Sequence, residues 1–412
     1  MEVQTRDRSS TFVEMDKLAA DKNKYWQIDF LKVFCMVLVI MDHSFTHDSL
    51  RKLASPLWQR VAIPLFMIII GFNWAKSMEK RKDEPLYRLY SWKNYFKKKL
   101  VRFALPFGII YGLSLLLYIG MLFIPDSLLK DVGNYGEPIL KVILFLPVWG
   151  PGNWFIPTLF LTIFIFPVIF WAFNKQPVLA LAGCFILEIL YHVFVYGIIV
   201  DYIELHPEWN IGVIYTFLIC TPFVLLSAIG LGVWLSQDHK YDSPRNIIIY
   251  VLGIISLLYL VYYTWDGTPL NQIYLNRVIG IINGDYNFMV YPWSALIVLV
   301  ALNVLPKEPY GKIYRNVSKI SDSTYHILMV QIFYFSIVYN LFLPMFGNYP
   351  IWASLRTEFY WAHYLWYYPF NLVFTFAVGT IWHTLEKELL WDRKKRFTKN
   401  RIEFLKVKGF IK

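Results

Sequence analysis

Long apolar blocks alternate with polar segments along the whole chain. Most of the blocks hold roughly 18 to 25 residues and almost no charge, and an α-helix of about 20 residues crosses the ~30 Å hydrocarbon core of a bilayer. Lipid cannot satisfy backbone N–H and C=O groups, so each block is predicted to be a transmembrane helix. The predicted spans are 29–46, 57–77, 101–124, 154–173, 178–199, 212–235, 246–264, 286–305, 322–343 and 366–386.

This pattern predicts an all-α fold, a polytopic helical bundle with about ten spans. We divide the chain into a cytoplasmic N-terminal segment (1–28), a membrane domain (29–390) and a basic cytoplasmic tail (391–412). The apolar stretch 138–149 is too short to span and runs into a segment rich in Pro and Gly that cannot continue a helix. We interpret it as a re-entrant or interfacial piece.

The distribution of positive charge predicts the orientation in the membrane. The chain has 40 Lys and Arg residues against 29 Asp and Glu, a net charge of +11. Ten basic residues lie in the 76–102 loop and ten more follow from Lys387 onward, so ten spans place both segments on one face. The positive-inside rule makes that face cytoplasmic and puts both termini inside.

The positive-inside rule and attraction to anionic lipid also explain the net positive charge, so nucleic acid is not an expected partner. We expect a multi-pass protein of the plasma membrane.

The three cysteines give no sign of metal or redox chemistry. Cys35, Cys184 and Cys220 all fall inside apolar blocks and lack metal-binding or redox spacing. We interpret them as small core residues, and no metal is expected. The first 25 or so residues show no signal-peptide pattern, so the first apolar block is expected to be retained.

Several ionisable residues lie inside the first predicted span, where they are costly and therefore candidate functional groups. Lys32 and His43 are eleven residues apart, which in an α-helix is three turns plus about 20° and a rise of about 16 Å. They are predicted to share one helix face, Lys32 near the inner end and His43 near the outer end. Asp42 adjoins His43 but points about 100° away, so the sequence does not assure a pair.

Each of these residues also has an ordinary structural explanation. Lys32 alone resembles a lysine that extends to the membrane interface, and His43 alone resembles a hydrogen-bonded packing residue. Glu188 and His192 are four residues apart in the fifth span, so they can hydrogen-bond on one helix face. They are either a structural pair or a site that handles substrate or protons.

An ordered set of motifs resembles the acyltransferase-3 family of integral-membrane acyltransferases. That family is marked by Arg or Lys, ten residues and then His in the first span, as in Lys32 to His43. Further segments that match the family in order are Ile63–Phe72, Tyr95–Arg102 with Pro106, Asn153–Pro157, Ser323–Ile327 and Leu385–Lys387. The chain departs from the family where Lys32 replaces the commoner Arg, Ile70 a Ser and Gln331 a frequent late His.

The resemblance implies an acyl-CoA donor, most commonly acetyl-CoA, and a glycan acceptor. His43 would be either a general base or a transient acyl carrier, with Asp42 as its neighbour. Lys32 would contact the donor, and Lys99 and Arg102 would hold its phosphates unless they only anchor the inner face. Candidate contacts for the acceptor are Trp154, Glu188, His192 and Arg277, although Trp154 can be an interfacial belt residue and Arg277 can pair with Asp285.

The leading hypothesis is therefore a membrane acyltransferase that moves an acyl group from cytosolic acyl-CoA to a hydroxyl of a cell-surface glycan or lipid-linked sugar. One alternative is a non-enzymatic transporter or flippase of such a polymer or lipid, which needs polar span residues but no CoA site. Another is a membrane N-acetyltransferase that acts on amino sugars. We expect Lys32→Met to weaken donor binding with little loss of stability, because the sequence shows Lys32 as an isolated charge near the end of a span.

Overall fold

The regular structure of this protein is helical. The computed structural model describes residues 25–45, 50, 53–123, 145–195, 220–266, 286–307, 311–342 and 366–392, and in these ranges it contains helices and no strand. The all-α prediction is thus confirmed. Arg277 and Asp285 lie outside the described residues, as do the chain termini and residues 138–144 of the short apolar stretch.

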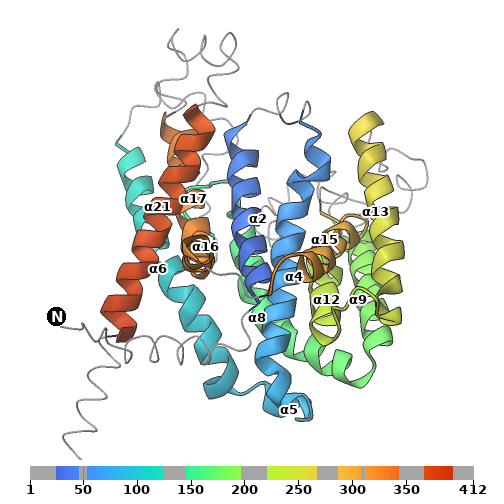
Figure 1. Ribbon diagram of the computed structural model, residues 1–412. Coiled ribbons are helices and arrows are strands. Elements are labelled where there is room, and N and C mark those ends of the chain that lie inside the picture. Colours follow the sequence, from blue (N-terminus) through green and yellow to red (C-terminus); the bar gives the residue numbers. More distant parts are fainter. Residues whose placement is uncertain are drawn as a thin grey trace, which may run out of the picture.

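Each of the ten predicted spans overlaps one helix, and most of these helices run roughly along one axis (Figure 1). In the described ranges, five are long and apolar enough to cross a membrane, α4, α6, α8, α9 and α13, while α12 and α15 are shorter apolar helices. The number of spans therefore stays a prediction. The bounds are α2 Trp26–Ser44, α4 Gln59–Met78, α6 Lys97–Met121, α8 Phe155–Lys175, α9 Pro177–Tyr191, α12 Leu226–Gln237, α13 Ile247–Asp266, α15 Tyr291–Val304, α17 Thr324–Ile337 and α21 Tyr368–Glu386.

Short helical elements connect or extend these helices. One of them, α16 (Lys312–Asp322), is strongly amphipathic and is seen almost end-on in Figure 1, so it runs across the bundle axis. The others are η1 Ser55–Leu57, η2 Glu79–Arg81, α5 Leu86–Leu89, η3 Trp92–Phe96, η6 Pro222–Leu225, η7 Pro244–Asn246, η9 Val338–Phe342 and η11 Lys387–Asp392.

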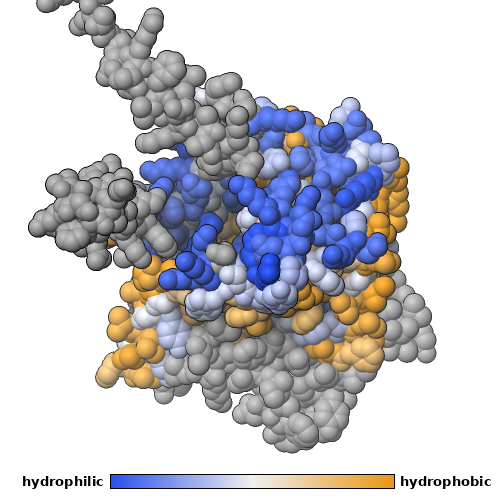
Figure 2. Space-filling model, turned by 90° about the horizontal axis from the view of Figure 1, so that it is seen from below, coloured by the Kyte–Doolittle hydropathy of each residue, from blue (hydrophilic) through white to orange (hydrophobic). Residues whose placement is uncertain are grey.

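The helices differ in how much of their surface is buried. Most of the span windows of α4 and α8 is inside the bundle, whereas α6, α9 and α13 bury about a third or less of theirs. Side chains such as Leu116, Leu187 and Leu258 point outward from those three helices. Figure 2 shows apolar surface along the flanks of the molecule. Such a flank is suited to lipid, because apolar side chains lose nothing by facing hydrocarbon.

Two glycines bring α4 and α12 into direct backbone contact. A Cβ atom on Gly71 would collide with the carbonyl oxygen of Ile229, and one on Gly232 would collide with that of Ile68. Small residues at helix interfaces let backbones approach closely, which is a main source of packing energy where lipid surrounds the protein. The α4–α12 contact therefore fixes the centre of the bundle.

One end of the bundle carries nearly all the described positive charge. We call it the basic face; it is formed by residues 76–102, 174–177, 237–246, 303–307 and 311–322, and hydrophilic residues cover it in Figure 2. Among the lysines and arginines in the described ranges, only Arg60 lies at the opposite end. This asymmetry agrees with the predicted orientation, in which the basic face meets the cytosol.

A non-helical segment, residues 145–154, is packed inside the bundle. Phe145 and Leu146 are fully buried, and the Asn153 side chain hydrogen-bonds both the amide and the carbonyl of Leu146. The hydroxyl of Ser114 on α6 accepts a hydrogen bond from the amide of Val148 at 3.0 Å. In a helix, these backbone N–H and C=O groups would bond to one another. Here the polar side chains of Asn153 and Ser114 bond to them instead, as buried irregular backbone requires.

Candidate active site

Helix α2 carries the two polar ends of the candidate site. It covers both Lys32 and His43, so the predicted helical spacing holds. Lys32 contacts Ser321 on α16, and the ring of His43 packs on Phe335 of α17, the next helix along the chain. Both residues therefore face the α16–α17 side of α2, as their spacing predicts.

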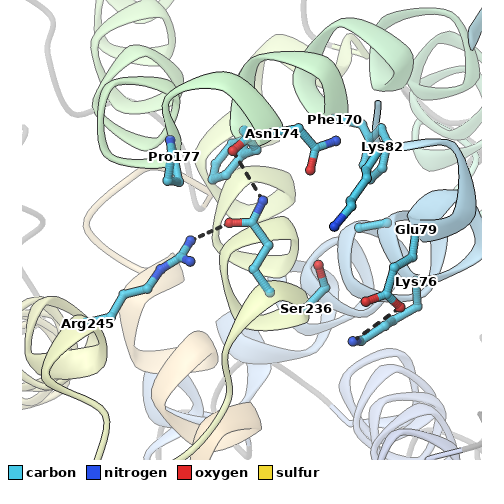
Figure 3. Close-up of a pocket in the computed structure, with 11 residues that line it drawn as sticks. Lys76, Glu79, Lys82, Phe170, Asn174, Pro177, Ser236 and Arg245 are labelled. Carbon is cyan, nitrogen blue, oxygen red and sulfur yellow. Dashed lines mark hydrogen bonds and ion pairs between the residues drawn. The ribbon is translucent and has the colours of Figure 1, made fainter. Parts of the chain in front are cut away.

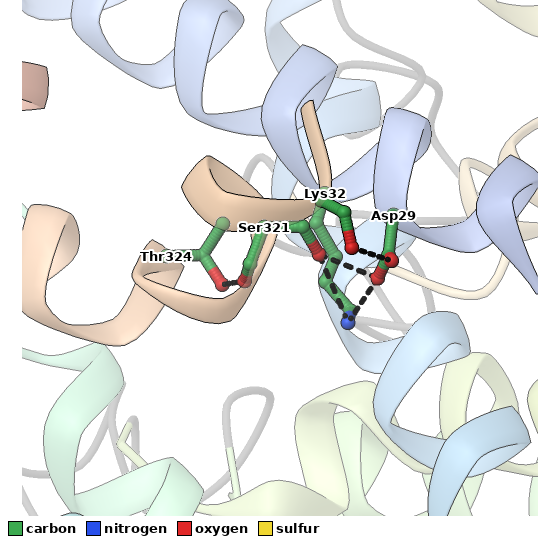
Figure 4. A network of polar contacts seen from close by, with 5 residues as sticks. Asp29, Lys32, Ser321 and Thr324 are labelled. Carbon is green, nitrogen blue, oxygen red and sulfur yellow. Dashed lines mark hydrogen bonds and ion pairs between the residues drawn. The ribbon is translucent and has the colours of Figure 1, made fainter. Parts of the chain in front are cut away.

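Lys32 belongs to a buried polar network at the basic face (Figure 4). Its Nζ atom lies 3.1 Å from Asp29 Oδ1 and 3.3 Å from the hydroxyl oxygen of Ser321. The hydroxyl of Ser321 donates to the same Asp29 oxygen at 2.6 Å, and that of Ser318 donates to the other oxygen at 3.2 Å. Asp29 is almost completely buried. The expectation of an isolated charge at position 32 is therefore wrong, since a carboxylate three residues earlier in α2 neutralises it.

Two further basic residues on α6 lie near this network. The ammonium of Lys99 sits 3.9 Å from the centre of the Trp74 ring, a cation–π contact, and is half-buried. Arg102 is exposed, and the carbonyl of the next residue, Phe103, accepts a hydrogen bond from the hydroxyl of Tyr325 at 3.0 Å, so Arg102 lies near the start of α17. The structure thus places Arg102 near the start of α17 and turns Lys99 inward toward α4.

A histidine–glutamate contact borders the same region. His326, near the start of α17, lies 3.0 Å from Glu386 at the end of α21, and its ring packs on His383 and Trp382 with centroid separations of 4.7 and 5.0 Å. Sequence reasoning noted both segments as family motifs but did not predict this contact. No local spacing reveals it, because it joins the ends of two different helices.

At the other end of α2, His43 is paired with Asp42 and backed by aromatic rings. The His43 Nδ1 atom lies 3.6 Å from Asp42 Oδ2, an ion-pair distance that the helical angle alone did not assure. The hydroxyl of Tyr339 donates to the backbone carbonyl of His43 at 2.6 Å, and the ring of Phe335 meets the imidazole edge-on. About a fifth of the His43 side chain is exposed. A carboxylate beside Nδ1 leaves Nε2 available to take a proton.

The middle of α17 contacts the non-helical segment. Gln331 is fully buried and its amide donates to the carbonyl of Pro151 at 3.4 Å. Gln331 and Phe335 are one turn apart, so they lie on the same face of α17. The side of α17 that reaches His43 therefore also contacts the segment 145–154.

The predicted pair in the fifth span is arranged differently. Glu188 is fully buried on α9, and both hydrogen bonds that the structure gives its carboxylate come from Ser227, from the amide at 2.8 Å and the hydroxyl at 2.6 Å. Ser227 lies in the first turn of α12, so Glu188 caps that helix across the interface. His192 is also buried. Helix α9 packs mainly on α12, α8 and η6, whereas α2 packs on α4, α16, α21, α17 and α15.

Trp154 also lies apart from the Lys32 network. It precedes α8, stacks at a tilt on Tyr286 with centroids 5.4 Å apart, and is partly buried beside Phe145 and Cys220. Of the acceptor candidates in the described ranges, none is brought by a described contact to the side of α2 that carries His43.

The geometry defines a helical membrane protein in which one helix carries a charged network near one end and an imidazole near the other. The chain belongs to the acyltransferase-3 family: residues 25–381, nearly its whole length, match that family, which is described as an acyltransferase domain. The protein is therefore a membrane acyltransferase. Neither a curated protein nor a solved structure matches the chain.

Proposed function

We propose that this acyltransferase moves an acyl group, typically acetyl, from cytosolic acyl-CoA to a hydroxyl of a cell-surface glycan or lipid-linked sugar. The observation that carries the proposal is the arrangement on α2, with Lys32 ion-paired to Asp29 at the basic face and His43 beside Asp42 toward the other end. About 16 Å of helix separates the two residues. The protein would sit in the plasma membrane with its basic face in the cytosol.

The donor would enter at the basic face. Its phosphates are anionic, and Arg102 is an exposed cation on α6 near the start of α17. The ammonium group of Lys99 packs on the Trp74 ring and would add a positive charge near the donor phosphates without contacting them directly. The flexible arm of CoA would then carry the thioester along α2, away from the charged cluster.

The chemistry would take place beside His43. The Nε2 atom of His43 takes the proton of the acceptor hydroxyl as the oxygen forms a bond to the thioester carbonyl carbon. The C–S bond then breaks, the ester remains on the acceptor, and the CoA thiolate leaves and takes up a proton. Asp42 stabilises the imidazolium that exists between these events, because a carboxylate near Nδ1 favours the charged ring.

The decisive experiment compares the surface polysaccharide of cells that carry the wild-type gene, no gene, His43→Ala or His43→Gln. Mass spectrometry should find acyl esters only with the wild type, since a positioned base typically contributes about 10²–10⁴ in rate. Membrane levels and melting temperature of each variant show that the protein is folded. A folded His43→Ala protein that gave wild-type ester levels would remove His43 from the mechanism.

Two further measurements, one on the purified protein and one on the acylated product, separate the competing functions. A transporter or flippase would show no CoA binding, so purified protein is titrated with acetyl-CoA, with and without Lys99→Glu and Arg102→Glu. Loss of binding in the charge-reversed variants supports a donor site at the basic face. An N-acetyltransferase would leave an amide, which survives the mild base that removes an ester.

A further inference from the structure

A pocket opens on the basic face, apart from the Lys32 network. Its volume is about 350 Å³, and it lies between the ends of α4, α8 and α12 and the starts of α9 and η7 (Figure 3). None of its lining residues belongs to α2, α6, α16, α17 or α21. The candidate active site therefore does not account for it.

The pocket has apolar walls and a polar rim. Ala75, Phe170, Phe173 and Pro177 supply apolar lining. Figure 3 shows the Asn174 amide, the Lys82 side chain and the Ser236 hydroxyl around the same central space. A pocket of this composition suits a ligand with one polar end and one apolar end.

Positive charge exceeds negative charge around this pocket. Lys76 lies 3.6 Å from Glu79, so these two charges offset each other. Lys82 has no acidic partner within the part of the chain that the structure describes. Arg245 packs its guanidinium 4.0 Å from the Trp234 ring, and Gln237 rather than a carboxylate accepts its hydrogen bond. Lys82 thus leaves an unpaired positive charge at the rim, and Arg245 adds a second that Asp238 offsets only through space, without an ion pair in the described ranges.

Two buried N–H groups of the lining residues also need an acceptor. Asn174 Nδ2 and Arg245 Nε are shielded from solvent, and in the described ranges neither has a hydrogen-bond partner. Buried donors are nearly always satisfied in folded proteins. Surplus positive charge at the rim of a pocket is what an oxyanion ligand would satisfy, and a small shift of the Asn174 amide would add a hydrogen bond to it.

We propose that this pocket binds a phosphate group at the cytosolic surface of the membrane. Two sources share this chemistry. An anionic phospholipid would place its headgroup at the rim and its glycerol region against the phenylalanines, and a soluble nucleotide phosphate, such as that of CoA, would use the same cations. The lipid source does not depend on the proposed reaction at His43, whereas the CoA source rests on the proposed donor and would be a second contact for it besides Arg102.

The test uses full-length protein and direct binding, with no activity readout. Native mass spectrometry measures bound phosphatidylglycerol, and equilibrium dialysis measures 3′,5′-ADP, the nucleotide end of CoA. Lys82→Gln and Arg245→Gln are compared with Lys80→Gln, which removes an exposed charge of the same segment that does not line the pocket. Lys82 is exposed on a turn after α4, so its substitution leaves the fold intact even if Arg245→Gln perturbs Trp234.

We expect at least a fivefold loss of binding of one probe in Lys82→Gln and Arg245→Gln, and no loss in Lys80→Gln. Loss confined to phosphatidylglycerol identifies a lipid headgroup, and loss confined to 3′,5′-ADP identifies the nucleotide phosphate. Equal binding of both probes by all three variants and the wild type would overturn the proposal. So would an equal loss in Lys80→Gln, because the effect would then be one of general surface charge.

Discussion

The imidazole of His326 and the carboxylate of Glu386 are 3.0 Å apart, although sixty positions separate them in the sequence. Both side chains are about nine-tenths buried, so this contact joins α17 to α21 at the basic face. Gly379 reinforces the same interface, because a Cβ atom there would press into the backbone of Ile327. The segments Ser323–Ile327 and Leu385–Lys387, which both resemble family motifs, thus form one structural unit.

Removal of the Glu386 carboxylate should destabilise this unit. Glu386→Ala leaves the buried His326 ring without its acceptor, and hydrogen bonds to charged groups contribute about 1.5–3 kcal/mol. The loss is measured as a lower melting temperature in detergent. Glu388→Ala, two residues later and exposed, is the matched control and should change little. Equal melting temperatures for the two variants would contradict the structural role.

Lys32→Met should cost stability, contrary to the expectation from sequence. The substitution leaves the buried Asp29 carboxylate without its cation, and breaking a fully buried pair costs about 3–5 kcal/mol. The Lys32 side chain is 21% exposed, so we expect less, about 1–3 kcal/mol. The double variant Lys32→Met with Asp29→Asn should recover most of the stability.

The same pair of variants separates stability from donor binding. If Lys32 also contacts the donor, the double variant should be stable yet have a raised KM for acyl-CoA, while Lys32→Arg keeps activity. A double variant with wild-type KM would show that Lys32 serves only to neutralise Asp29.

Gly71→Ala should disrupt the contact between α4 and α12. The added methyl group meets the backbone carbonyl of Ile229, which cannot rotate away as a side chain would. Overpacking of this kind costs about 1–3 kcal/mol. Gly112→Ala on α6 is the control: a Cβ there meets nothing within 4 Å, so the change should be neutral or slightly stabilising. The measurement is thermal unfolding, and equal melting temperatures would contradict the backbone contact.

His239, in the turn between α12 and α13, should make stability depend on pH. Burial first, and then the charge of Lys76, lower its pKa in the folded protein. As pH falls through about 6.5, the ordinary value, the unfolded chain takes up a proton before the folded one. The stabilisation is therefore present above that pH and is lost below it. His239→Gln should reduce the drop in melting temperature between pH 7.5 and 5.5, whereas Lys240→Gln should not.

Orientation is open to a direct test. Single cysteines near residues 130 and 350 should react with an impermeant reagent added outside intact cells, and cysteines near 90 and 400 should react only after lysis. The positions near 90 lie on the basic face, which the positive-inside rule assigns to the cytosol. Labelling near 90 in intact cells would invert the topology and move the proposed donor site outside.

Hydropathy and helical periodicity predicted the helices and the common direction of Lys32 and His43 correctly, because both are local properties of the chain. The partners of polar residues are not local. Asp29 and Ser321 are 292 positions apart, and the Glu188 carboxylate is held by Ser227, 39 positions later, rather than by the neighbour that helical spacing favours. Periodicity gives the face of a helix, but only packing decides which helix lies against it.

The depth reached by the segment 145–154 bears on how far an acyl group has to travel. Its Pro151 carbonyl meets Gln331, seven residues after α17 begins at Thr324 on the basic side, a rise of about 10 Å. Lipid alone would insulate the two compartments with ~30 Å of hydrocarbon. Non-helical polar backbone therefore lies about 10 Å along α17 from its basic-side end, so an acyl group that moved along α17 would meet this backbone well before it had covered that thickness.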